Sequence, residues 1–305
     1  MAIIDKKGYI RGRIGNLVYR KVGDTNIIQS RPAKVRQTTA TKESALEFGL
    51  ASSTAKVLRY MFAGLSHYAD GGMINRMNQC VLQAIRNGGG ATRGQRDLHQ
   101  GDLSLLEGFQ FNKNSPLNEI LPFMPTVSVA EEGSVRVILP AMDSEELGWL
   151  YGAEGCSLRF TVMSVDFKKQ YYQLLGHHEL DVRKGKVIEQ LEWNTPERAE
   201  KGSIVLVALS AVFHTPDGIR HDGIILNDKD FFPAAIVAAL HTPAMADGKE
   251  NPETGSYRLP IFGYQGADIL RELERLQVKE SKRKKGKGSE TNGMDPPVQR
   301  GKVFF

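Results

Sequence analysis

The chain has 305 residues, of which 41% are hydrophobic and 25% are charged, a balance typical of a globular protein and not of general disorder. No stretch approaches the roughly 18 consecutive apolar residues of a membrane-spanning helix, and charge appears too early at the start for a secretory signal, so we expect a cytoplasmic protein. Cys80 and Cys156 lie far apart without a CxxC partner, which excludes a zinc knuckle or a disulfide framework and predicts two buried, inert thiols.

The net charge of +5 is distributed in three blocks. Residues 1–42 carry ten Lys and Arg against two Asp, and residues 279–302 carry eight against three acidic residues. Residues 43–278 hold the remaining 22 basic and 30 acidic residues. Two basic arms therefore flank an acidic body. Such arms can bind nucleic-acid phosphates, dock on the acidic body of a neighbouring copy, or serve as solvated tails.

The first element is a predicted β-hairpin, in which residues 16–22 and 25–30 flank a turn at Gly23-Asp24. A hairpin of this size cannot bury a core alone, so we expect it to act as an inter-subunit arm. Aromatic residues interleaved with basic ones also suit base stacking and phosphate binding, although packing explains the tyrosines equally well. The glycines before the hairpin do not have dinucleotide-binding spacing and indicate tight turns. The arm residues are Tyr9, Arg11, Arg13, Tyr19, Arg20, Lys21, Ile27 and Arg31.

Two helices follow a polar linker. Apolar residues at helical spacing predict one helix from residue 43 to about 65 and another over 73–86, which ends at the glycines after Asn87. We expect the two to pack as an αα-hairpin. The glycine-rich stretch 88–101 lacks the Lys-Ser/Thr pair of a phosphate-binding loop, and residues 103–125 are typical of a connector.

From Thr126 the apolar period changes to two, which predicts an antiparallel β-sandwich. Residues 158–165 and 204–213 are long, rich in β-branched residues and free of proline, so we expect them to be central strands. The apolar stretch 231–240 fits either a short strand or a closing helix. Further strands are predicted at 127–130, 135–139, 171–175, 187–193 and 224–226.

The C-terminal part predicts a short amphipathic helix over 267–278 that dissolves into a basic tail. The tail offers nucleic-acid contacts at Lys282, Arg283, Lys284, Lys285 and Lys287. The chain ends in Val303, Phe304 and Phe305, which we predict to dock into an apolar groove because a terminal aromatic pair serves no purpose in a solvated tail.

Few motifs carry chemistry. His177 and His178 are adjacent and point to opposite faces of a strand, while His214 and His221 bracket a turn where solvated loop residues are a better explanation than a metal site. There is no GxSxG or HExxH motif, and the paired carboxylates fall at turns. We therefore predict no catalytic residue, no metal and no cofactor.

The opening resembles that of an uncharacterised protein family common in Bacteroidota. Members begin with a Gly-x-x-Gly-Asn-x-x-Tyr hairpin and an Arg-x-Pro exit, followed by a Thr-rich linker, a helical segment and a β-rich C-terminal half. Here Gly12-Arg-Ile-Gly-Asn-Leu-Val-Tyr19 carries the match, and the exit is Arg31-Pro32. The resemblance is specific over residues 8–48, implies the same order of elements, and implies no activity.

These observations predict an α+β protein with a hairpin arm and linker (1–42), a helical segment and connector (43–125), a β-sandwich (126–264), and a helix with a basic tail (265–305). The predicted function is a non-enzymatic structural subunit that self-assembles through its arms, in a phage-like, filamentous or shell-like particle. The alternatives are a nucleic-acid-binding or packaging accessory and a ligand-binding β-sandwich with Trp149, Trp193 and Tyr151 as platforms.

Overall fold

The computed structural model describes residues 2–31, 37–89, 95–215, 224–243 and 258–288, with side chains in the last stretch described as far as Ser281. The chain divides into two compact units, Met1–Lys42 and Glu43–Phe305. Both α-helices and antiparallel sheets are present, which confirms the predicted α+β class. The helices, the large sheet and the helix near the C-terminus belong to one unit rather than to the three segments expected from the sequence.

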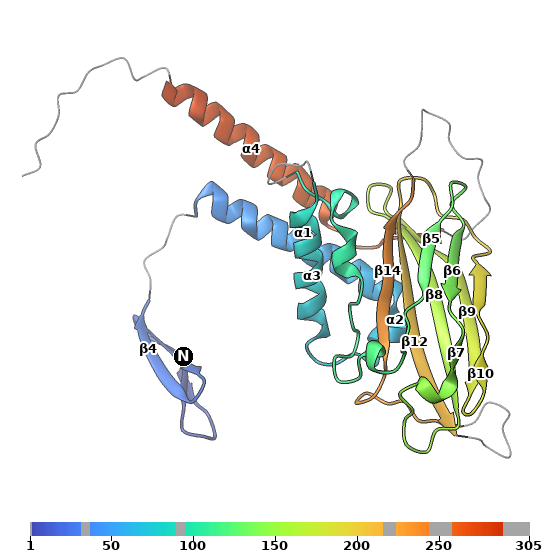
Figure 1. Ribbon diagram of the computed structural model, residues 1–305. Coiled ribbons are helices and arrows are strands. Elements are labelled where there is room, and N and C mark those ends of the chain that lie inside the picture. Colours follow the sequence, from blue (N-terminus) through green and yellow to red (C-terminus); the bar gives the residue numbers. More distant parts are fainter. Residues whose placement is uncertain (1, 32–36, 90–94, 216–223, 244–257, 289–305) are drawn as a thin grey trace, which may run out of the picture. The chain divides into compact units, whose positions relative to one another are not determined.

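The smaller unit is a four-stranded antiparallel sheet in the order β1-β2-β3-β4 (Figure 1). The strands are β1 (Ala2–Ile4), β2 (Ile10–Ile14), β3 (Leu17–Val22) and β4 (Thr25–Ser30). Val22 lies opposite Thr25 across the expected Gly23-Asp24 turn, and Gly15 and Gly23 both have positive φ, which glycine adopts without steric cost. β1 and β2 were not predicted from the sequence, because strands of three and five residues show too little alternation of apolar and polar residues.

The larger unit is built on a six-stranded antiparallel sheet. Its central strands are β8 (Gly155–Asp166) and β12 (Ile204–Thr215), as predicted. β9 (Tyr171–Arg183) and β15 (Arg258–Pro260) extend the β8 side. On the other side, β12 pairs with both β14 (Ala234–His241) and the short β13 (Ile224–Ile225), so the ambiguous apolar stretch forms a strand.

Alternate residues of the central strands enter two different hydrophobic cores. Leu206 and Val165 face a core formed with helices, whereas Val205 and Phe160 face a core formed with a smaller sheet. The large sheet is thus covered by helices on one face and by a smaller sheet on the other, and the helical cover was not expected from the sequence (Figure 1). The small sheet consists of β5 (Thr126–Val129), β6 (Val135–Leu139) and β11 (Leu191–Asn194), and a further pair joins β7 (Met142–Asp143) to β10 (Val187–Ile188).

The helical layer contains α1 (Thr39–Met61), the single turn α2 (Ala63–Ser66) and α3 (Met73–Asn87). Arg86 at the end of α3 lies 3.4 Å from Glu47 near the start of α1, and Arg59 near the end of α1 donates to Asn78. These two contacts join α3 to α1. Four short 3-10 helices lie in connecting segments, at Leu98–Gln100, Leu103–Leu106, Leu117–Glu119 and Ser144–Glu146.

The last helix, α4 (Gly266–Gly288), corrects the prediction of a short helix that dissolves into a tail. Leu273 is fully buried, and the side chain of Ile269 lies against Gly49 of α1. The helix continues through the Lys- and Arg-rich run because both residues have good helix propensity and their charge is favourable near a helix C-terminus. No helix within the described residues combines the length and apolar character needed to cross a membrane.

Candidate assembly interface

The two faces of the N-terminal sheet differ in chemistry. In an antiparallel pair, residues directly opposite each other share a face. Ile14 lies opposite Leu17, and Tyr19 lies opposite Ile28. Because Leu17 and Tyr19 are two residues apart in β3, these four side chains lie together on what we call the Tyr19 face. The other face, here the Arg20 face, carries Arg13, Val18, Arg20, Val22 and Ile27.

The N-terminal sheet buries almost nothing. None of the described residues 2–31 is buried, although the segment is rich in isoleucine, valine and leucine. Ile14, Leu17 and Ile28 of the Tyr19 face are 55%, 41% and 58% exposed. An isolated sheet of this kind lacks a hydrophobic core, so its apolar side chains gain most of their stabilisation only against a second surface.

The predicted arm residues occupy different parts of this sheet. The Lys21 ammonium lies 3.8 Å from the centre of the Tyr9 ring, and Arg11 lies 3.4 Å from Asp5. Asp5 accepts hydrogen bonds from the backbone of Tyr9 and Lys7, which with the nearby positive charges lowers its pKa. The Lys21 and Tyr9 side chains thus contact each other. For Tyr9 this is a packing role, one of the two explanations, packing or base stacking, that the sequence allowed.

Arg13, Arg20 and Arg31 remain exposed, whereas Tyr19 and Ile27 are half-buried. The Arg13 side chain donates to the Gly15 carbonyl at 3.1 Å and so helps to define the turn between β2 and β3. The structure therefore separates the predicted arm residues: Tyr19 and Lys21 lie on the Tyr19 face, and Arg13, Arg20 and Ile27 lie on the opposite face.

The sheet also has two open edges, because among the described residues β1 pairs only with β2 and β4 pairs only with β3. Exposed edge strands present unpaired backbone N–H and C=O groups to any further strand. Within the smaller unit itself, neither the Tyr19 face nor these edges are covered.

The predicted C-terminal contacts have a different status. Val303, Phe304 and Phe305 lie outside the described residues, as does His221. Lys282, Arg283, Lys284, Lys285 and Lys287 fall on α4, although their side chains are outside the described part.

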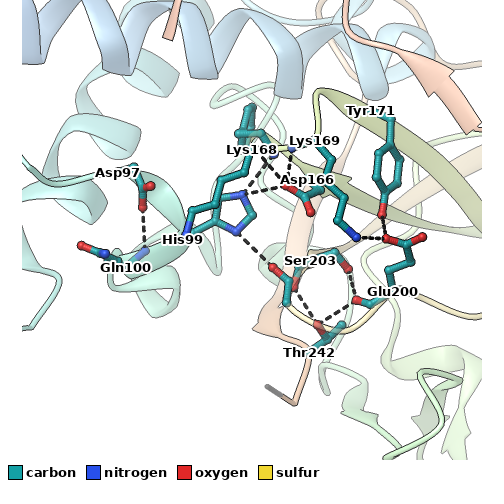
Figure 2. A network of polar contacts seen from close by, with 12 residues as sticks. Asp97, His99, Gln100, Asp166, Lys168, Lys169, Tyr171, Glu200, Ser203 and Thr242 are labelled. Atoms are coloured by element: carbon teal, nitrogen blue, oxygen red, sulfur yellow. Dashed lines mark hydrogen bonds and ion pairs between the residues drawn. The ribbon is translucent and has the colours of Figure 1, made fainter. Parts of the chain in front are cut away.

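A buried polar network in the larger unit was not found from the sequence (Figure 2). His99 Nε2 accepts a hydrogen bond from the backbone N–H of Phe167 at 3.0 Å, so the proton lies on Nδ1, which faces the Gly202 carbonyl at 3.2 Å. Burial lowers the pKa of His99, and the Asp166 carboxylate 3.6 Å from Nε2 opposes this effect only in part. Both ring nitrogens are thus engaged by backbone groups, and the neutral imidazole links three loops.

A second part of the network surrounds Glu200 (Figure 2). Lys169 and the Tyr171 hydroxyl both donate to Glu200 Oε2 at 2.6 Å, and Arg258 pairs with the other carboxylate oxygen. Burial favours the neutral carboxyl group, but these donors outweigh it and lower the pKa of Glu200. Burial and the Glu200 contact raise the pKa of Tyr171. Because each of these polar groups has a hydrogen-bond or ion-pair partner within the chain, the network stabilises the fold.

The remaining candidates have packing roles. Trp149 donates its indole N–H to the Ser144 carbonyl at 2.7 Å, and Trp193 stacks on His178. Tyr151 is 99% exposed. These contacts give the two tryptophans structural explanations.

Cys156 is buried, as predicted, whereas Cys80 is only partly buried, and both are free thiols. Burial raises the pKa of Cys156 to about 12 and that of Cys80 to about 11, so both are protonated at neutral pH. Within the described residues, no group of three or more His, Cys, Asp or Glu side chains could hold a metal ion.

No protein-family model, curated protein or solved structure shows a significant match to this chain.

Proposed function

We propose that this protein is a non-enzymatic structural subunit that associates with copies of itself through its N-terminal sheet. The observation that carries the proposal is the exposure of Ile14, Leu17 and Ile28 around Tyr19 in a sheet without a buried residue. A second copy of the same face supplies an apolar surface of matching size, in the manner of two sheets that pack face to face.

The size of the face argues for repeated contacts. Its longest strands have six residues, and strands of that length at about 3.3 Å per residue and 4.8 Å spacing give a four-stranded face of roughly 300–400 Å². A standard stable interface covers about 800 Å² on each partner. A single pair of faces therefore associates weakly, and stable assembly requires further contacts such as strand pairing along the β1 or β4 edge.

Deletion of residues 1–32 tests the proposal, because these residues precede α1 and belong to the smaller unit. We expect light scattering after size-exclusion chromatography to show an oligomer for the full chain and a folded monomer for the deletion variant. An oligomer that survives the deletion would refute the role of the sheet.

Nucleic-acid binding is the second candidate, favoured by the exposed Arg13 and Arg20 on one face of the sheet. Phosphate contacts weaken steeply with salt, whereas apolar association does not. Nuclease treatment and a salt series of the full chain separate the two: loss of mass with nuclease favours nucleic acid, and a nuclease-insensitive oligomer favours self-association.

A further inference from the structure

The helical layer leaves part of the large sheet uncovered, and a groove of about 280 Å³ lies at this boundary. Met61, Phe62 and Leu65 from the end of α1 and from α2 form one side, together with Tyr68 and Phe232. Tyr68 and Phe232 stack with their ring centres 4.5 Å apart, which gives this wall a rigid aromatic surface.

The floor of the groove is polar, in contrast to the wall. Thr161 lies opposite His177, and Arg159 lies opposite Ser210 on the neighbouring strand. Further along the same face of β8, Met163 and Val165 belong to the core beneath the helices. On β12, Ser210 is followed on the same face by Val212, which also lines the groove and belongs to that core, so the polar side chains of the floor lie beside apolar ones.

The floor offers hydrogen-bond donors to an anion. Arg159 is the only Lys, Arg, Asp or Glu among the described lining residues. It donates to Glu179 through Nε at 3.0 Å, and its two terminal amino groups form no hydrogen bond within the described part of the chain. Ser210, which also lines the groove, is only 2% exposed.

We propose that this groove binds a small organic carboxylate with an aromatic or branched aliphatic body. The terminal amino groups of a guanidinium match the two oxygens of a carboxylate, and the Ser210 hydroxyl adds a donor beside them. The Tyr68–Phe232 wall then receives the apolar body, an arrangement of few polar groups in an apolar pocket that is typical of small-molecule sites. This site is independent of the proposed self-association, because it lies wholly in the larger unit.

Isothermal titration calorimetry of the full chain with 3-phenylpropionate at neutral pH tests the proposal. We expect a dissociation constant in the millimolar range or below, as for other ligands of about ten non-hydrogen atoms. The neutral analogue 3-phenylpropionamide should bind at least about tenfold more weakly, because it cannot form charge-assisted hydrogen bonds. Absence of carboxylate binding, or equal affinity for the amide, would overturn the proposal.

Variants locate the site. Arg159→Gln should weaken binding at least about tenfold, and Ser210→Ala should weaken it several-fold. Glu179→Gln should leave the affinity unchanged or increase it, because this change removes a carboxylate that competes for Arg159. The matched control is Arg136→Gln, which breaks the ion pair with Glu192 on the smaller sheet. Unchanged affinity in both Arg159→Gln and Ser210→Ala, or equal losses in the control, would place the ligand elsewhere.

Discussion

Replacement of Ile28 by Asp tests the Tyr19 face as the surface of association. Ile28 is 58% exposed and lies opposite Tyr19, so its side chain has much apolar surface left to bury. The matched control is Val22→Asp, because Val22 is 52% exposed, is also β-branched and belongs to the opposite face. Both changes place one carboxylate on the sheet at a similar cost in strand propensity.

The magnitude follows from the exposed fraction. Full burial of a large aliphatic side chain stabilises by about 1.5–3 kcal/mol, so burial of the exposed 58% contributes about 0.9–1.7 kcal/mol. A symmetric pair of faces contains this residue twice, which gives about 1.7–3.5 kcal/mol, or a roughly 20- to 400-fold weaker association constant for Ile28→Asp. Desolvation of the new carboxylate increases the loss further.

Sedimentation velocity over a concentration series measures this change, with circular dichroism to confirm that each variant is folded. We expect Ile28→Asp to raise the protein concentration at which the oligomer dissociates by at least about 20-fold, while Val22→Asp behaves as the parent chain. If the two variants dissociate alike, or if only Val22→Asp dissociates, the assignment of the Tyr19 face is wrong.

Three further predictions concern the larger unit. Because burial lowers the pKa of His99, the unfolded chain takes up a proton near pH 6.5 before the folded chain does, so stability should fall as the pH drops below that value. The free energy of unfolding, measured with urea, should depend less on pH in His99→Asn than in the parent chain. An equal pH dependence in the two proteins would contradict this role of His99. Leu206→Asp should destabilise the fold by at least about 4 kcal/mol or prevent folding, because Leu206 is fully buried in the central strand. The control Leu206→Met should destabilise it by less than about 1.5 kcal/mol. Normal thermal melting of the Asp variant would show that the strand lies at the surface. Gly133→Ala should lower the melting temperature more than Gly152→Ala. Both glycines have positive φ, but only the new Cβ at position 133 meets a backbone carbonyl, that of Ala199. Equal decreases in melting temperature would show that the Ala199 contact has no effect.

Local patterns in the sequence were sufficient to predict those helices, strands and turns that depend on neighbouring residues or that are buried along their whole length. The continuous apolar run of β12 predicts a strand buried on both faces, and the helical spacing over α1 and α3 predicts amphipathic helices. The turn at Gly23-Asp24 is likewise determined by neighbouring residues, since glycine alone adopts positive φ there without steric cost. In each case the pattern that predicts the element lies within a short stretch of the chain.

Only the tertiary structure decided which partners cover each surface. Leu206 and Val205 are both apolar, and nothing in their local sequence shows that helices cover one and a small sheet the other. His99 has no recognisable motif because its partners are backbone groups of Phe167 and Gly202, which carry no residue-type signature. Arg159 and Ser210, which are 51 residues apart in the chain, meet through the register of β8 and β12. Such contacts depend on long-range pairing, and pairing depends on the packing of the whole sheet rather than on any short stretch of sequence.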